Sequence, residues 1–266
     1  MTYTIQQATL SRGITTVLDG VTLVLPRNRV IGLIGPNGSG KTTLLASLAG
    51  EKVVARGTIS IDQDILADLS EAKLASRRAV MLSHNAIPFE MTVRQLVDIG
   101  LYSFPYWPDH AREQLVELVA NVVGLSKYLD TPLLARSDGE QQRAHFARAL
   151  VQTRASVQEQ GKAWLLLDEP TANLDPLQQQ SVMKICHDLS REQDVGIVVA
   201  IHDLTLARQW CDDVVMLGQQ RVLCMGPACQ ELNPTNLRQM YGDSLAIHVV
   251  DEPVPGILIG SAAKLC

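Results

Sequence analysis

The chain has 266 residues, of which 46% are hydrophobic and 4% aromatic, and its formal net charge is −5. This length suits one large domain or two modest ones, and the acidic balance argues against a general nucleic-acid-binding protein. No apolar run approaches the roughly 18–20 residues that span a bilayer, and no basic segment precedes an apolar core, so we expect neither a membrane span nor a signal peptide. The five cysteines are scattered without a C-x-x-C pair, which is typical of reduced thiols.

Hydrophobic periodicity and turn residues predict an alternation of strands and helices. In chain order, the predicted elements are strands at 17–25 and 30–34, a helix at 43–49, a strand at 57–62, a helix at 71–78, a strand at 79–82, helices at 91–100 and 109–124, a strand at 163–167, a helix at 176–193, a strand at 196–201, a helix at 204–211 and a strand at 213–217. Because several strands are apolar along their whole length, we expect a mostly parallel sheet covered on both faces. The polar segment 152–162 is predicted to be an exposed loop.

Residues 35–42 form a complete G-x-x-x-x-G-K-T phosphate-binding loop between an apolar strand and a helix. Its glycines let successive N–H groups point at phosphate oxygens, and the following helix directs the positive end of its dipole at the same anion. Lys41 would reach the β- and γ-phosphates of ATP, and the Thr42 hydroxyl group would ligate Mg²⁺. The predicted nucleotide-binding residues of this segment are Gly35, Pro36, Asn37, Gly38, Ser39, Gly40, Lys41, Thr42 and Thr43.

Further polar residues follow two later apolar strands. Asp168 and Glu169 end the strand predicted at 163–167, and His202 follows the strand at 196–201. Because the carboxyl ends of parallel strands share one edge of a sheet, we expect these side chains beside the phosphate-binding loop. Asp168 is predicted to hold Mg²⁺, Glu169 to polarise the attacking water, and His202 to steady the γ-phosphate or Glu169.

Taken in this order, the motifs resemble those of the nucleotide-binding subunit of ATP-binding cassette (ABC) transporters over nearly the whole chain. Residues 136–143, Arg-Ser-Asp-Gly-Glu-Gln-Gln-Arg, are similar to the family signature LSGGQ or LSGGE, and residues 171–175 are similar to its D-loop. The resemblance implies a dimer in which each ATP lies between the phosphate-binding loop of one subunit and the signature of the other. It also implies that the following residues contact nucleotide: Ser137, Gly139, Glu140 and Asp175.

The fold implied by this resemblance is α/β, a P-loop NTPase ABC cassette. It has a mostly parallel core sheet, an N-terminal antiparallel β subdomain and a helical subdomain inserted at about 90–150. One ATPase domain would cover residues 1–230, and a short C-terminal extension, 231–266, would be packed on it.

The sequence departs from the family pattern at several positions. Arg136 replaces the signature leucine and Asp138 its first glycine, and a carboxylate near the γ-phosphate should repel it. Ser83 takes the place of the Q-loop glutamine, and we therefore include it among the candidate metal ligands. No aromatic residue is evident for stacking on adenine, and Arg12 or Arg27 could cover the base instead. These departures fit three cases: an active homodimeric ATPase that tolerates the unusual residues, a heterodimer with one good and one weak ATP site, or a weak ATPase.

Segments 91–102 and 201–212 resemble the ATPase subunits of bacterial importers for iron siderophores, haem and vitamin B12. The expected function is to power an importer for an iron chelate, siderophore or haem, ahead of vitamin B12. This implies ATP and Mg²⁺ as cofactors and a second ATPase subunit, with a homodimer as the first expectation. It also implies two transmembrane permease subunits that dock around residues 83–108 and, indirectly, a periplasmic or surface substrate-binding protein. The chain would lie at the cytoplasmic face of the inner membrane, and nucleic acid is not an expected partner. Two alternatives stay open: a soluble ABC ATPase of a non-transport system such as iron–sulfur cluster assembly, or a weakly active nucleotide-sensing subunit.

Overall fold

The computed structural model describes residues 2–52, 54–82, 90–242, 245–250 and 254–261. Its central sheet has the strand order β10-β9-β3-β8-β7-β6, in which only the β9–β10 pair is antiparallel. The strands are β3 (Val30–Ile34), β6 (Arg78–Met81), β7 (Ala163–Asp168), β8 (Val195–Ala200), β9 (Asp213–Gly218) and β10 (Arg221–Pro227). The prediction of a mostly parallel core sheet is therefore confirmed.

A second, antiparallel sheet has the order β2-β1-β4-β5. It consists of β1 (Thr2–Arg12), β2 (Thr15–Pro26), β4 (Arg56–Ile61) and β5 (Asp64–Ile65). Gly13 joins β1 to β2 with a φ of 61°, a backbone conformation that glycine adopts without strain. This sheet is the predicted N-terminal antiparallel subdomain.

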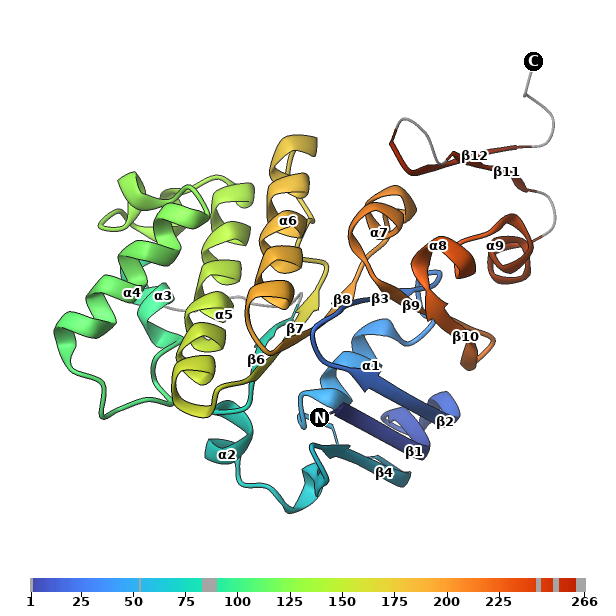
Figure 1. Cartoon of the computed structure of the whole chain (residues 1–266), viewed down its shortest axis with the longest axis horizontal. Helices are drawn as coiled ribbons and strands as arrows, with labels where there is room; N and C mark the ends of the chain where they lie inside the picture. The colour runs from blue at the N-terminus through green and yellow to red at the C-terminus, as the bar shows by residue number, and fades with distance from the viewer. Residues whose placement is uncertain (1, 53, 83–89, 243–244, 251–253, 262–266) are drawn as a thin grey trace.

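Helices cover both faces of the central sheet (Figure 1). One face carries α5 (Asp138–Gln160), α6 (Pro176–Glu192) and α7 (Leu204–Trp210), and the other carries α1 (Lys41–Leu48) together with the antiparallel sheet. The remaining helices are α2 (Glu71–Ala75), α3 (Val93–Ile99), α4 (Asp109–Val122), α8 (Ala228–Glu231) and α9 (Pro234–Tyr241), with short 3₁₀ turns at Leu66–Asp68, Ser126–Tyr128 and Leu133–Ala135. The α5 helix is long enough to contact both the sheet and α3 and α4, which form the helical lobe.

The two layers bury separate hydrophobic cores. All six residues of β7 and of β8 are buried. Because side chains alternate along a strand, Leu165 and Leu167 enter the core beneath the helices, whereas Trp164 and Leu166 enter the core beneath the antiparallel sheet. The central sheet is thus packed on both faces, which fixes the positions of the residues at the ends of its strands.

Two of the predicted elements are wrong. Residues 152–160 are not an exposed loop but the last turns of α5, with Gln152, Thr153 and Ser156 buried. The Gln152 amide donates to the carbonyl oxygens of Ala75 (2.9 Å) and Arg78 (3.2 Å), so polar character here reflects hydrogen bonding and not exposure. The helix predicted at 71–78 ends at Ala75, because its last residue already belongs to β6.

The C-terminal part of the described chain forms a hairpin of β11 (Leu245–Val250) and β12 (Gly256–Ser261). Its residues contact α7: the Ile257 N–H donates to the Thr205 hydroxyl oxygen at 3.1 Å, and the Gln209 amide donates to the Pro255 carbonyl oxygen at 2.8 Å. Figure 1 shows the hairpin beyond α7 at the upper right. The division of the chain at residue 230 stays a prediction.

Candidate functional site

Three chain segments with predicted site residues meet at one edge of the central sheet. β8 lies between β3 and β7 and runs parallel to both, with Ala200 in register with Leu33 and with Asp168. The Ile201 N–H donates to the Leu33 carbonyl oxygen at 3.3 Å, which continues the pairing to the end of β3. The segments that follow β3, β7 and β8 therefore leave the sheet side by side.

The phosphate-binding loop needs its glycines for two different reasons. A Cβ atom on Gly35 would lie 2.4 Å from the Ser39 Oγ atom and 2.5 Å from the Leu217 carbonyl oxygen, so a side chain has no space there. Gly40, the N-cap of α1, has a φ of 103°, and its Cβ would lie 2.9 Å from side-chain carbons of Val17 and Leu18. The loop is held tightly between the end of β9 and the start of β2, as a preformed anion site requires.

Lys41 is buried in this loop while Thr42, next to it, is exposed. The Lys41 ammonium group donates to the carbonyl oxygens of Gly35 at 2.7 Å and of Pro36 at 3.2 Å. Burial lowers the pKa of Lys41, while the negative charges of Glu169 and Asp168 act in the opposite direction.

The two acidic residues at the end of β7 have different environments. Asp168 is fully buried at the end of the strand. Glu169 has a φ of 52°, and its N–H donates to the Ala200 carbonyl oxygen at 3.1 Å. Its Oε1 lies 2.7 Å from Nε2 of His202, and both side chains are partly exposed, at 37% and 44%. The structure thus brings a solvent-accessible carboxylate against the imidazole that sequence analysis placed on the same edge.

The residues at this edge fit a hard divalent cation. Asp168 offers a carboxylate and Thr42 a hydroxyl oxygen, and Mg²⁺ is usually held by one or two such groups together with substrate phosphates. In the described ranges, no group of three or more His, Cys, Asp or Glu residues could hold a metal by itself. Ser83, the remaining candidate ligand, lies outside the described residues.

The signature segment starts α5 with a capping box. The Glu140 N–H donates to the Ser137 hydroxyl oxygen at 3.3 Å, and the Ser137 N–H donates to the Glu140 carboxylate at 3.0 Å. This backbone hydrogen bond from Ser137 is the main reason that the pKa of Glu140 is lowered. Asp138 is exposed in the first turn, where its charge favours the helix dipole. At the position of the signature leucine, the Arg136 guanidinium lies over the Tyr128 ring, 4.8 Å from its centroid.

The other signature and D-loop candidates lie next to each other. A Cβ atom on Gly139 would be 3.0 Å from the Asn173 carbonyl oxygen, so α5 approaches the D-loop backbone closely. Asp175 caps α6 by accepting from the Gln178 N–H at 2.9 Å. Among the described residues, no hydrogen bond joins the predicted signature residues to the phosphate-binding loop of the same chain. Their contacts with nucleotide stay a prediction.

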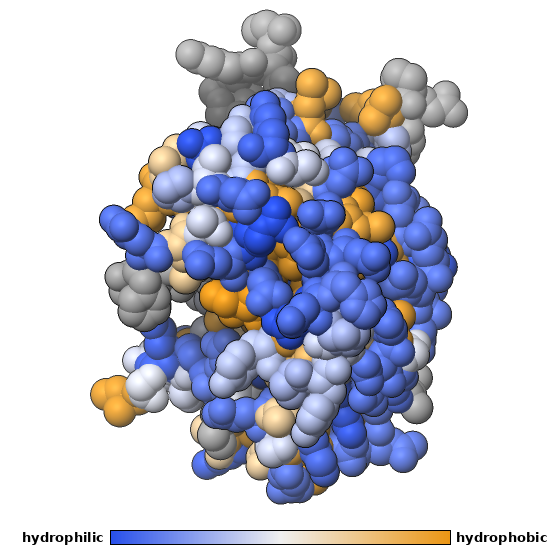
Figure 2. Space-filling view, turned by 90° about the vertical axis from the view of Figure 1, so that its left-hand side faces the viewer, coloured by the Kyte–Doolittle hydropathy of each residue, from blue (hydrophilic) through white to orange (hydrophobic). Residues whose placement is uncertain are grey.

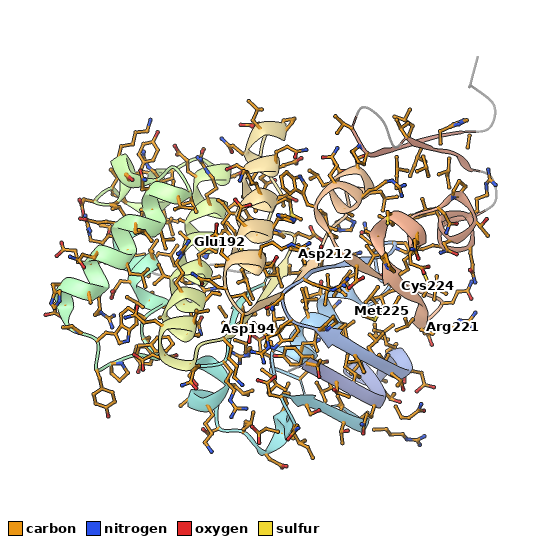
Figure 3. The ribbon with its side chains drawn as sticks, viewed as in Figure 1. Glu192, Asp194, Asp212, Arg221, Cys224 and Met225 are labelled. Atoms are coloured by element: carbon orange, nitrogen blue, oxygen red, sulfur yellow. The ribbon has the colours of Figure 1, made fainter. Side chains whose placement is uncertain are left out.

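One of the two adenine candidates is wrong. Arg27 precedes β3 at the edge opposite the phosphate-binding loop, where it pairs with Asp62 (3.2 Å) and with Asp194 (3.1 Å), the residue before β8 that is labelled in Figure 3. Arg12 ends β1 and pairs with Thr15 across the turn that precedes Val17, so it stays a candidate.

Sequence analysis gave no separate role to Gln142, whose amide donates to the carbonyl oxygen of Glu169 at 2.9 Å. A contact with a backbone atom leaves no pattern of side-chain types in the sequence, so no sequence signal could have identified it.

Comparison with known proteins agrees with these motifs. Residues 18–172 match the family model described as ABC transporter. The chain belongs to the ABC transporter family. The hemin import ATP-binding protein HmuV of Bordetella avium is 39% identical over 242 residues, which cover 91% of this chain and 92% of that protein.

Solved structures share the ABC cassette fold. The chain is similar to cbiO1 of Clostridium perfringens, part of the ABC transporter complex cbiONQ, with a TM-score of 0.73, 25% identity and coverage of 89% and 92% of the two chains. It is also similar to a chain of a putative metal-chelate type ABC transporter in an inward-facing conformation, with a TM-score of 0.79, 19% identity and coverage of 98% of both chains. None of the helices in the described ranges has the length and hydropathy needed to cross a membrane.

Proposed function

We propose that the chain is the ATP-hydrolysing subunit of a bacterial importer for haem or a related iron chelate. The observation that carries the ATPase proposal is the Glu169–His202 pair, 2.7 Å apart, at the sheet edge that also holds Lys41. The haem proposal is supported by the 39% identity to a hemin import ATP-binding protein over most of both chains. Siderophores are the second candidate cargo. No residue of this chain would contact the cargo, so the residues of the site do not distinguish the two.

The proposed division of labour follows from the positions of the side chains. The loop amides of 35–43 and the Lys41 ammonium bind and orient the phosphates, and Thr42 and Asp168 would hold Mg²⁺, which neutralises charge on the phosphate oxygens. Glu169 accepts a hydrogen bond from the attacking water and polarises it. His202 keeps the Glu169 carboxylate in position through the 2.7 Å contact, since a fixed base avoids reorganisation during the reaction.

We further propose that two copies of the chain bind two ATP molecules between them. Ser137 would donate its hydroxyl proton and Gly139 its N–H to the phosphates bound by the other copy, where the start of α5 also presents the positive end of a helix dipole. Glu140 and Asp175 cap their own helices and would contact nucleotide only at the edge of the site. The exposed Asp138 carboxylate would weaken the binding of phosphate at this helix end.

The helical lobe is the proposed docking surface for two permease subunits. Its face is mostly hydrophilic, with hydrophobic residues exposed in patches (Figure 2). Ile99, Tyr102 and Tyr106 in and after α3 are 47%, 85% and 97% exposed, and large exposed side chains of this kind are common at interfaces. Through the permease, the chain would be held at the cytoplasmic face of the inner membrane, and a substrate-binding protein would act on the other side.

The alternatives receive less support. A role in iron–sulfur cluster assembly fits neither the name of the relative nor the ABC transporter complex that contains the similar cbiO1 chain. A nucleotide-sensing subunit without turnover would not need the Glu169–His202 pair.

The test is to purify the tagged full-length chain from detergent-solubilised membranes and to identify its partners by mass spectrometry. We expect a polytopic permease, and ATP hydrolysis by the complex that rises when a haem-loaded binding protein is added. Recovery of soluble partners alone would contradict the importer proposal. Stimulation by a ferric siderophore system, but not by haem, would transfer the proposal to siderophores.

A further inference from the structure

Glu169 has a backbone conformation that its surroundings must maintain. Its φ of 52° lies in the left-handed region, which is unfavourable for a residue other than glycine. Such strain persists only where neighbouring groups fix the backbone, and it is commonly found at functional sites. The direction of the Glu169 carboxylate toward His202 therefore depends on whatever holds the backbone of Glu169.

Within the described part of the chain, three hydrogen bonds hold this backbone. The Glu169 N–H donates to Ala200 at 3.1 Å, and the Glu169 carbonyl oxygen accepts from the Ala172 N–H at 3.1 Å and from the Gln142 amide at 2.9 Å. The two bonds to the carbonyl oxygen use both of its lone pairs. The bonds to Ala200 and Ala172 come from the same sheet edge and turn, whereas the Gln142 bond comes from a different element, α5.

Gln142 lies five residues after Ser137, and thus about 7.5 Å along the helix. The first turn of α5 is in addition seated against the D-loop, since a Cβ on Gly139 would be 3.0 Å from the Asn173 carbonyl oxygen. A displacement of the signature end of this continuous helix, Asp138–Gln160, is carried to Gln142 and so to Glu169.

We propose that Gln142 is a positioning residue that holds Glu169 of its own subunit in the left-handed conformation and thereby links the two ATP sites. The inference rests on the proposed function, in which α5 contacts the ATP bound by the other subunit. Seating of α5 on that nucleotide then sets the position of the carboxylate that serves the subunit's own nucleotide. In this proposal Gln142 acts on the reaction through the carbonyl oxygen of Glu169, to which its amide donates at 2.9 Å.

The first test is steady-state ATP hydrolysis by the full-length chain with Gln142→Met, which removes the donor and keeps the length of the side chain. We expect kcat to fall about ten-fold with little change in the KM for ATP, because the carboxylate is misplaced while the phosphate site is intact. The matched control is Gln152→Met on the same helix. It removes a similar amide-to-carbonyl contact, to Ala75 and Arg78, and should lower the melting temperature without changing kcat.

The second test uses mixed dimers in which one subunit carries Glu169→Gln, so that only the other subunit hydrolyses ATP. Gln142→Met in the subunit with the intact Glu169 should lower turnover about ten-fold, and Gln142→Met in the Glu169→Gln subunit should not. Ser137→Ala in the subunit with the intact Glu169 changes the signature that faces the ATP of the partner, which is the inactive site. We expect it to slow hydrolysis when Gln142 is present and to have a smaller effect with Gln142→Met.

An unchanged kcat in a folded Gln142→Met variant of an active wild type would overturn this inference alone. If that variant does not fold, the same measurement is made on Gln142→Glu, which also lacks the donor, and an unchanged kcat would again overturn the inference. Equal losses from both placements in the mixed dimers would likewise overturn it. A wild-type protein without ATPase activity, alone or with its permease, would overturn the proposed function and this inference together.

Discussion

Nε2 of His202 lies 2.7 Å from Oε1 of Glu169, although the two residues follow different strands and are 33 positions apart in the chain. The pairing exists because β7 and β8 are neighbours in the sheet, with Asp168 in register with Ala200. A carboxylate held by an imidazole beside a phosphate-binding loop is suited to activating a water molecule.

Glu169→Gln should abolish most ATP hydrolysis while ATP binding persists. The amide keeps the size of the side chain but is too weak a base to polarise water, and loss of a positioned base costs about 10²–10⁴-fold. Turnover and the affinity for a fluorescent ATP analogue should be measured on the same preparation. Glu169→Gln combined with His202→Ala should cost little more than Glu169→Gln alone, because the pair acts as a unit. Multiplicative losses would contradict that pairing.

Asp138→Gly should raise the rate of ATP hydrolysis and lower the KM for ATP. The exposed Asp138 carboxylate stands in the first turn of α5, where the proposed dimer places the γ-phosphate of the other subunit. The helix loses a favourable charge at its N-terminus, so the melting temperature should fall slightly. Asp138→Asn is the matched control, because it removes the charge and keeps the size. A rate that is unchanged or lower in both variants would show that the carboxylate is no handicap.

His145 should make the stability of the protein depend on pH in the mildly acidic range. Burial, with a smaller contribution from Arg148, lowers the pKa of His145 from 6.5 to about 4. Between these values the unfolded chain binds more protons than the folded chain, so the free energy of unfolding falls as the pH is lowered from about 6.5 to about 4. The loss attributable to this residue is on the order of 2 kcal/mol.

The measurement for His145 is the urea midpoint of the wild type and of His145→Leu at several pH values. His145→Leu removes the titrating group, so its midpoint should decline less between pH 7 and pH 4.5 than that of the wild type. Parallel curves would contradict the assignment to His145.

Gly196→Ala should destabilise the protein by about 1–3 kcal/mol through overpacking. The new Cβ atom would lie 2.4 Å from Cζ3 and 2.6 Å from Cε3 of Trp164, whose ring also packs on Tyr3 with centroids 4.7 Å apart. Thermal unfolding of Gly196→Ala, Trp164→Phe and the double variant would measure the coupling. Because the shorter phenylalanine ring makes room for the methyl group, the double variant should lose less than the sum of the single losses. Strict additivity would argue against a clash with the indole ring.

Sequence alone predicts the parts of the site that depend on consecutive residues. The loop at 35–42 and the pair Asp168-Glu169 each combine a fixed spacing with an apolar strand, so local pattern determines both position and chemistry. The parallel sheet follows from the same strands, because apolar residues on both faces require cover on both faces.

Other features depend on where chain segments meet, which local patterns do not determine. The segment 152–160 is polar but helical, and its first part is buried because the Gln152 amide donates to the carbonyl oxygens of Ala75 and Arg78. Arg27 is near the phosphate-binding loop in sequence, yet a whole strand separates them in space. The role proposed for Gln142 depends on a carbonyl oxygen, an atom that every residue possesses.

The strand β7 delivers Asp168 and Glu169 and at the same time separates the two hydrophobic cores. Any change of shape along it disturbs the packing of two layers at once, so this strand should accept very few substitutions in a saturation-mutagenesis library selected for folding. Inherited variation that makes a cassette of this kind faster or slower is then expected in α5 and in the turns around Glu169.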